Sequence, residues 1–210
     1  MKQLKQSKAT IKRLCILYRH LEELDALNIK KVSSIKIAEA LDVTAFNIRK
    51  DISSFGEIGA SGSGYEVKKL KTFLGEKLGL NKERKACVVG LGRLGSAILN
   101  FDKFLIAGYT IAAGFDANIN RIETLSSHVP LHPIYELEEI INQKKIELAI
   151  LTVPAAVALE SAKRLADAGI KGIVNFTPMV ININNSNIII RTIDIIHEFR
   201  TINALLHLKV

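Results

Sequence analysis

The stretch CVVGLGRLGSA, residues 87–97, limits most strongly what this chain can fold into. Its apolar run leads into a complete GxGxxG pattern, formed by Gly90, Leu91, Gly92, Arg93, Leu94 and Gly95. In such a turn the first glycine permits a tight bend, the second lets the backbone approach a pyrophosphate, and the third lets the following helix pack closely on the strand. The phosphates then lie at the helix N-terminus. The stretch therefore predicts a strand, a glycine-rich turn and a helix that bind a dinucleotide.

An acidic residue follows at the spacing that a dinucleotide fold requires. Asp116 ends the next apolar run, GFDAN, 21 residues after Gly95. A carboxylate at this place hydrogen-bonds the ribose hydroxyls and disfavours a 2′-phosphate. The pattern indicates NADH or NAD+ rather than the phosphorylated forms. The alternative is a fold that kept the turn and lost the ligand.

Apolar runs alternate with helical patterns from residue 80 to residue 190. This alternation predicts a parallel sheet covered by helices on both faces, an α/β Rossmann domain. Open sheets of this kind bind ligands at the carboxyl ends of their strands. We expect that edge to carry, from LTVP and NFTP, the residues Thr152, Val153, Pro154, Asn175 and Phe176. Simple core filling remains the alternative for Phe176.

The first 79 residues have a different character. Residues 1–80 carry a net charge of +6 and residues 81–210 a net charge of +2, and the first twenty residues include six Lys or Arg and no acid. Such an uneven distribution favours a polyanionic partner, with a solvated basic face as the alternative. Gly79 is a plausible helix C-cap, and the polar run after it places a domain boundary near residue 80.

The order of elements in residues 1–79 is that of a winged helix. A helical stripe at residues 11–27 precedes two short helices in VSSIKIAEALDVTAFNIRKDISSFG, with Ser33 or Ser34 and Thr44 as N-caps. A glycine-rich turn between two short strands and a closing helix follow. The expected core is Ile11, Leu14, Ile16 or Leu17, Leu21, Leu24, Leu27, Ile35, Ala38, Leu41, Phe46, Ile48 and Ile52.

The second short helix would be the recognition helix. Asn47, Arg49 and Lys50 can reach a base edge or a phosphate there. A surface salt bridge of Arg49 or Lys50 with Asp51 or Glu39 is the alternative.

Residues 191–210 predict a terminal helix whose apolar face packs on its own domain or on a partner subunit, with Thr192 as a possible cap. Ile193, Ile196 and Phe199 begin that face. The sequence has no apolar run long enough for a transmembrane helix and no signal-peptide pattern, so we expect a cytoplasmic protein. Cys15 and Cys87 are expected to be small buried residues, and the five histidines form no metal-binding pair, so no metal is expected.

Enzyme activity is not expected. A small NAD-dependent dehydrogenase needs a substrate pocket and an acid–base group, and only one helix remains after Ile190 to build them. A nucleotide-binding partner protein without DNA activity is a third possibility, which the winged-helix pattern argues against.

The whole chain resembles the Rex redox-sensing transcriptional repressors of bacteria. The resemblance is carried by IKRLCILYRHL, SSIKIAEALDVTAFNIRKDISSFG, GSGYEV, VVGLGRLGSA, GFDAN, AILTVP and GIVNFTP. It implies a homodimer with a winged-helix domain (1–79), a Rossmann NAD(H)-binding domain (80–190) and an exchanged C-terminal helix (191–210). It also implies a repressor that binds double-stranded DNA with an inverted repeat of TTGTGA-type half-sites when NADH is scarce and releases it on binding NADH.

The resemblance carries over to particular residues. Ser34, Arg49, Lys50 and Tyr65 match the DNA-contact region of the family, and Arg19 and Asp194 match a charged pair that couples its two domains. The full set of expected DNA-binding residues is Lys12, Arg13, Ser34, Thr44, Asn47, Arg49, Lys50, Ser63 and Tyr65.

Two departures from the family pattern affect the expected function. The wing has Ala60, Ser61 and Ser63 where the family usually has Lys or Arg, which predicts weaker phosphate contact. Phe101 replaces a family tyrosine whose hydroxyl would bond the coupling aspartate. A Rex-like paralogue with an altered or weakened NADH response is therefore the alternative.

Overall fold

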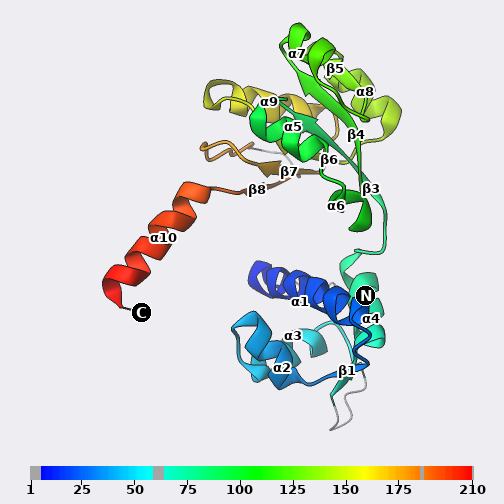
Figure 1. Ribbon diagram of the computed structural model, residues 1–210, viewed down its shortest axis with the longest axis vertical. Helices are drawn as coiled ribbons and strands as arrows, with labels where there is room; N and C mark the ends of the chain where they lie inside the picture. Colours follow the sequence, from blue (N-terminus) through cyan, green and yellow to red (C-terminus); the bar gives the residue numbers. More distant parts are fainter. Residues whose placement is uncertain (1–5, 59–63, 185–186, 210) are drawn as a thin grey trace. The chain divides into compact units, whose positions relative to one another are not determined.

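The computed structural model describes residues 6–58, 64–184 and 187–209. The chain divides into two compact units, Met1–Lys82 and Glu83–Val210, and each has its own apolar core (Figure 1). The predicted departures at Ala60, Ser61 and Ser63 lie outside the described residues.

The first unit contains three helices packed around a two-stranded sheet and closed by a fourth helix. Its elements are α1 (Lys8–Ala26), β1 (Lys31–Val32), α2 (Ser34–Leu41), α3 (Ala45–Ser53), β2 (Tyr65–Glu66) and α4 (Val67–Leu78). β1 pairs antiparallel with β2, Val32 opposite Tyr65. The strand after the glycine-rich turn therefore pairs with residues between α1 and α2. A strand of two residues is too short to show alternation, so β1 could not be recognised from the sequence pattern.

The core of the first unit lies between α1, α3 and α4. Leu14, Leu17 and Leu21 on α1 are fully buried, as predicted, and so are Ile48 and Ile52 on α3. The other predicted core residues Ala38, Leu24 and Leu41 are buried or partly buried.

Four predicted core residues are exposed instead, and this part of the prediction is wrong: Ile11, Leu27, Ile35 and Phe46. Of the alternatives Ile16 and Leu17, Leu17 is the buried one. On α2 the inward position belongs to Ile37, which is fully buried. Residues two apart on a helix are rotated by about 200°. Burial of Ile37 therefore turns Ile35 outward, and burial of Ile48 turns Phe46 outward in the same way.

A buried ion pair joins α1 to α3. The Asp51 carboxylate is almost completely buried and accepts hydrogen bonds from Arg13 Nε at 2.7 Å and Arg13 Nη2 at 2.9 Å. Thr10 Oγ1 donates to the same carboxylate at 3.2 Å. The hydrogen bonds to Asp51 raise the pKa of the Arg13 guanidinium. Arg13 thus has a structural partner within the unit, in addition to its predicted role toward DNA.

Replacing Arg13 should destabilise the first unit strongly. In Arg13→Ala the buried Asp51 carboxylate keeps only the Thr10 hydroxyl, and we expect a loss of about 3 kcal/mol in the free energy of unfolding. Urea unfolding followed by circular dichroism measures it. Arg19→Ala is the matched control, because the Arg19–Glu23 pair is exposed and 3.8 Å long, and should change stability by less than about 1 kcal/mol. Equal effects in both variants would contradict a structural role for the Arg13 pair.

The second unit is a six-stranded parallel sheet in the order β5-β4-β3-β6-β7-β8. Its strands are β3 (Arg84–Val89), β4 (Tyr109–Asp116), β5 (Leu131–Pro133), β6 (Leu148–Leu151), β7 (Gly172–Asn175) and β8 (Ile189–Thr192). Its helices are α5 (Arg93–Leu99), α6 (Lys103–Ile106), α7 (Ile119–Thr124), α8 (Leu137–Lys144), α9 (Ala155–Asp167) and α10 (Ile195–Leu208), with a 3-10 turn at Ile134–Glu136. The predicted parallel sheet is confirmed.

Helices cover both faces of the sheet. Cys87 and Val89 of β3 belong to a cluster with α8 and α9, whereas Val88 belongs to a second cluster with Leu91 and Leu99. Neighbouring residues of β3 thus enter opposite cores, as expected of a central parallel strand. Burial raises the pKa of the Cys87 thiol to about 12. Cys15, in contrast, is exposed on α1, so the expectation that it is buried is wrong.

The helix after the glycine turn ends at Leu99, and a separate short helix, α6, follows. β8 precedes the terminal helix, which begins at Ile195 with Asp194 as its N-cap, since Asp194 Oδ1 accepts a hydrogen bond from the His197 backbone N–H at 3.1 Å. Thr192 therefore ends a strand and does not cap the helix. In the described part of the chain, no helix is long and apolar enough to cross a membrane.

Candidate functional site

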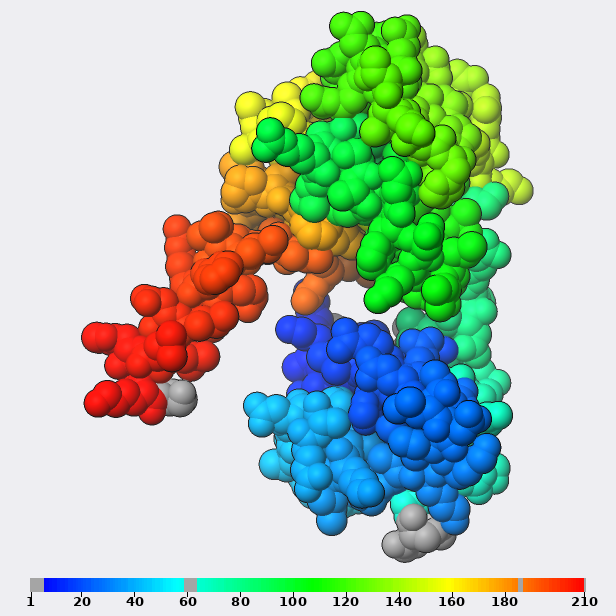
Figure 2. Space-filling view, viewed as in Figure 1, coloured from blue at the N-terminus to red at the C-terminus, as the bar shows by residue number. Residues whose placement is uncertain are grey.

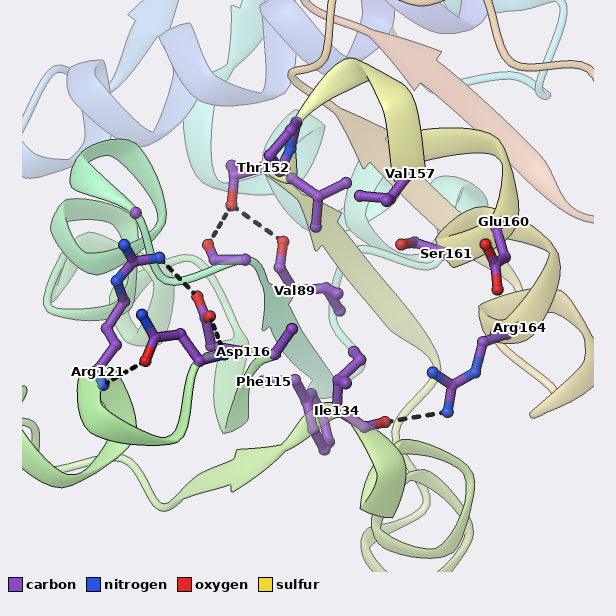
Figure 3. Close-up of a pocket in the computed structure, with 16 residues that line it drawn as sticks. Val89, Phe115, Asp116, Arg121, Ile134, Thr152, Val157, Glu160, Ser161 and Arg164 are labelled. Atoms are coloured by element: carbon purple, nitrogen blue, oxygen red, sulfur yellow. Dashed lines mark hydrogen bonds and ion pairs between the residues drawn. The ribbon is translucent and has the colours of Figure 1, made fainter.

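A cavity of about 850 Å³ lies at the carboxyl ends of β3, β4 and β6 (Figure 3). Its walls come from the glycine turn, the loop after β4, the 3-10 turn, the loop after β6 and one face of α9. The lining residues are Val89, Gly90, Gly92, Phe115, Asp116, Ala117, Asn118, Arg121, Ile134, Thr152, Val153, Pro154, Val157, Glu160, Ser161 and Arg164.

The glycine turn is held by the strands on both sides of it. The Gly90 N–H donates to the Phe115 carbonyl of β4 at 2.8 Å. Beyond β6, Thr152 Oγ1 donates to the Gly90 carbonyl at 2.6 Å and to the Val89 carbonyl at 3.1 Å (Figure 3). Gly90 has φ +92°, in the region that favours glycine. The turn is therefore fixed before any ligand enters.

Gly92 and Gly95 have opposite steric surroundings. A Cβ on Gly95 would lie 1.9 Å from the Gly90 carbonyl oxygen and 2.8 Å from Thr152 Oγ1, so no side chain fits there. A Cβ on Gly92 would meet nothing within 4 Å, and Gly92 lines the cavity. Gly95 thus allows close packing of α5, whereas Gly92 leaves the turn open toward a ligand. This division of roles is the one that a pyrophosphate site requires.

Asp116 lies at the rim of the cavity with both carboxylate oxygens already bonded. Oδ2 accepts from the Leu91 N–H at 2.7 Å and from Arg121 Nη1 at 3.1 Å, and Oδ1 accepts from the Asn118 N–H at 2.8 Å. The side chain is 7% exposed, and the Arg121 side chain is 45% exposed. The carboxylate is therefore fixed in position and keeps an arginine beside it.

The other end of the cavity is bounded by Arg164 and the 3-10 turn. Arg164 Nη2 donates to the Ile134 carbonyl at 3.0 Å (Figure 3). Its guanidinium also holds the Glu138 carboxylate at 2.8 and 2.9 Å, which lowers the pKa of that carboxyl. Ile134 and Val157 add apolar surface next to these polar groups. An end with apolar walls and a few fixed polar groups suits a flat heterocycle.

The structure brings together part of the predicted nucleotide site. Six predicted residues line the cavity: Gly90, Gly92, Asp116, Thr152, Val153 and Pro154. Leu91 is buried in the core cluster with Val88 and Leu99, Gly95 is buried, and Arg93 and Leu94 are exposed.

Asn175 and Phe176 do not line the cavity. Asn175 is fully buried, and its amide bonds its own loop: Oδ1 accepts from the Thr177 N–H at 3.0 Å, and Nδ2 donates to the Met179 carbonyl at 2.9 Å. Phe176 packs against the core cluster of Val88 and Leu91, in line with the core-filling alternative. Their contact with a nucleotide stays a prediction.

The sequence reasoning missed several residues of the cavity. Asn118 and Arg121 follow the GFD run directly, so the position of Asp116 could have pointed to them. Ile134, Glu160, Ser161 and Arg164 reach the cavity only because α9 and the 3-10 turn pack beside β4 and β6, and nothing in their local sequence indicates this.

Four of the predicted DNA-binding residues lie on or next to α3, namely Thr44, Asn47, Arg49 and Lys50. Thr44 Oγ1 accepts from the Asn47 N–H at 3.2 Å and caps the helix. Arg49 Nη1 donates to Ser34 Oγ at 2.9 Å, which ties α3 to the start of α2. Lys12 and Lys50 are exposed. Tyr65 is buried in β2, and burial raises the pKa of its hydroxyl.

The three residues expected to couple the two domains have local partners. Arg19 Nε lies 3.8 Å from Glu23 Oε1, and Asp194 caps α10. Phe101 is 52% exposed and makes an edge-to-face contact with Phe104, with ring centroids 5.8 Å apart. Among the described residues, no group of three or more His, Cys, Asp or Glu is placed to hold a metal ion.

The fold and the cavity define a class of protein in which a winged-helix unit is joined to a Rossmann-type unit. Residues 5–53 match the family model of the putative DNA-binding protein N-terminus, and residues 81–179 match that of the CoA binding domain. The redox-sensing transcriptional repressor Rex of Carboxydothermus hydrogenoformans is 40% identical over 195 residues, 93% of each chain. The chain belongs to the family of Rex redox-sensing transcriptional repressors. Its relatives in that family are repressors and not enzymes.

Two solved structures share the whole fold. The crystal structure of RSP in complex with β-NAD+ and operator DNA is 33% identical and has a TM-score of 0.89, covering 99% of this chain and 95% of that one. The crystal structure of RSP in complex with β-NADH is 32% identical and has a TM-score of 0.86, covering 99% and 97%. The described fold is therefore the fold of a Rex repressor.

Gly95 and Gly92 should differ in their effect on stability. Gly95→Ala forces α5 away from the Gly90 carbonyl, and we expect a loss of about 3 kcal/mol in the free energy of unfolding. Gly92→Ala meets no atom and should cost less than about 1 kcal/mol. Urea unfolding of both variants measures the difference. A Gly95→Ala variant as stable as Gly92→Ala would contradict the close packing described here.

Proposed function

We propose that this chain is a repressor that binds NADH in the cavity of its second unit and an inverted-repeat operator through its first unit. NADH binding releases the operator, and NAD+ favours the DNA-bound form. Residues 1–79, 80–190 and 191–210 then act as the DNA-binding domain, the NAD(H)-binding domain and an exchanged dimerisation helix. We place the protein in the cytoplasm, where operator DNA and NADH are both present.

The observation that carries the ligand assignment is the open backbone at Gly92 beside the fixed carboxylate of Asp116. A pyrophosphate needs close approach to the turn, and Gly92 leaves that space clear. Asp116 Oδ1 accepts one hydrogen bond and has a second lone pair for a ribose hydroxyl, whereas Oδ2 already accepts two hydrogen bonds. The apolar and polar walls near Arg164 suit the adenine ring. The residues present therefore fit a dinucleotide.

The DNA assignment rests on charge and on the exposed face of α3. The first 80 residues carry a net charge of +6, and Arg49 and Lys50 lie side by side on the recognition helix. Arginine and lysine reach phosphates and guanine edges in the major groove. The bond from Arg49 to Ser34 orients its guanidinium toward the surface formed by α2 and α3.

The dimer assignment rests on α10. No described residue of this helix is buried, and the surface of α10 is uncovered in the face shown (red, Figure 2). The exposed apolar side chains of the helix and the residue before its cap are Ile193, Ile195, Ile196, Phe199, Ile202, Leu205, Leu206 and Leu208. An apolar helix this exposed marks a protein–protein interface. We propose that a second copy of the chain covers it.

A labelled duplex with an inverted TTGTGA-type repeat tests the main proposal. Fluorescence anisotropy of the duplex at low salt measures binding. The protein should bind the duplex and release it as NADH is added, while NAD+ should have little effect. Gly92→Ala should bind the duplex equally well but need at least about tenfold more NADH for release, because its methyl group occupies the pyrophosphate space. DNA binding indifferent to NADH would contradict the sensing role. No binding of the duplex would contradict the repressor role.

A charge on the apolar face of α10 should dissociate the dimer. Phe199→Asp places a carboxylate where we expect apolar contact with the second copy, and such a buried unpaired charge costs several kcal/mol. Light scattering after size-exclusion chromatography should give half the mass of the wild type. Asn203→Asp, which changes a polar residue of the same helix, is the control and should remain dimeric. A Phe199→Asp variant of unchanged mass would contradict the role of this helix.

A further inference from the structure

The recognition helix carries an exposed aromatic residue that the function described so far leaves unexplained. Phe46 is the second residue of α3 and its side chain is 65% exposed. It does not belong to the core cluster of the first unit, and no ring contact of Phe46 occurs among the described residues. Covering a phenylalanine ring with another surface removes apolar area from water and is favourable.

Phe46 shares one face of α3 with the two cations of the recognition helix. Residues 46, 49, 50 and 53 are three, four and seven positions apart and therefore lie on the same face. The opposite face, with Ile48, Asp51 and Ile52, is buried. Figure 1 shows α3 beside α2 in the first unit. The surface that covers Phe46 must therefore accept two positive charges as well as an apolar ring.

The same residues border a groove of about 660 Å³. Its lining residues are Phe46, Arg49, Lys50, Ile52, Ser53, Gly56, Glu57, Ile58 and Tyr65. The Phe46 ring therefore lines the same groove as the two cations, Arg49 and Lys50. The major groove of DNA offers the required combination of phosphates and an apolar group, because every thymine presents a 5-methyl group there.

We propose that Phe46 is a base-reading residue whose ring contacts the 5-methyl group of a thymine in each operator half-site. The first turn of a recognition helix is the part that meets base edges, and Phe46 occupies that turn because Thr44 caps the helix. Arg49 and Lys50, one turn further along, then fix the register of the helix on the duplex. This inference rests on the proposed function, since it requires that α3 binds operator DNA.

Replacing thymine by deoxyuridine tests the contact directly, because it removes only the methyl group. We would compare the duplex of inverted TTGTGA half-sites with a series in which one symmetry-related pair of thymines at a time is deoxyuridine. One pair should weaken binding of the wild type by about 15-fold, the effect of two buried methyl groups. Phe46→Ala should bind the unmodified duplex at least about 15-fold more weakly than the wild type does. Deoxyuridine at the same thymine pair should then weaken the binding of Phe46→Ala by less than twofold.

Two further variants control for indirect effects. Phe46→Leu keeps apolar surface and should retain part of the sensitivity at that pair. Leu27→Ala removes an exposed apolar side chain at the end of α1, away from α3, and should match the wild type on every duplex. Circular dichroism of Phe46→Ala verifies that the first unit is folded.

The outcomes separate this inference from the proposed function. Wild-type binding that no deoxyuridine pair weakens by more than twofold overturns the inference alone. The same holds if Phe46→Ala remains as sensitive as the wild type, since another residue then reads the methyl group. Phe46→Ala that binds every duplex like the wild type also overturns it and indicates a protein partner for this face. Failure of the wild type to bind any duplex overturns the proposed function and this inference together.

Discussion

The close approach of Gly95 to the carbonyl of Gly90 is the constraint on which the nucleotide site depends. It brings α5 against the end of β3, so that the N-terminus of the helix and the open backbone at Gly92 face the cavity. Thr152, which follows β6, donates a hydrogen bond to the same Gly90 carbonyl. The Asp116 carboxylate, at the end of β4, accepts a hydrogen bond from the Leu91 backbone N–H. Three strands therefore fix one turn, and a ligand meets a surface that needs little reorganisation.

The sequence alone predicted the parts of the site that are local. The glycine pattern, the strand that ends at Asp116 and the start of α9 at Pro154 each follow from a few consecutive residues. Arg164 and Ile134 could not be found in this way, because their contact with the cavity arises from packing of α9 against the 3-10 turn. Asn175 lies at the expected edge of the sheet, and only the fold shows that its amide bonds Thr177, Met179 and Thr192; its contact with a nucleotide stays a prediction.

The core errors on α2 and α3 have one physical origin. Short helices carry too few residues to define which side is buried, so Ile35 was assigned to the core where Ile37 is buried, and Phe46 was assigned to it together with Ile48, although only Ile48 is buried. Arg13 illustrates the same limit for charged residues, since only the fold shows that its partner is the buried Asp51. The exposed aromatic residue on α3 became informative because the core prediction failed there.

The uncovered α10 links folding of this chain to its concentration. A helix of 14 residues is marginal on its own in water, and α10 buries none of its described residues against its own unit. If a second copy of the chain covers this helix, as proposed above, its helical order depends on that copy and mass action governs it. On dilution, the amide hydrogens in the last turns of this helix should exchange faster than those of the sheet. Fast exchange at the C-terminus would then indicate dissociation of the dimer while the nucleotide cavity is still folded.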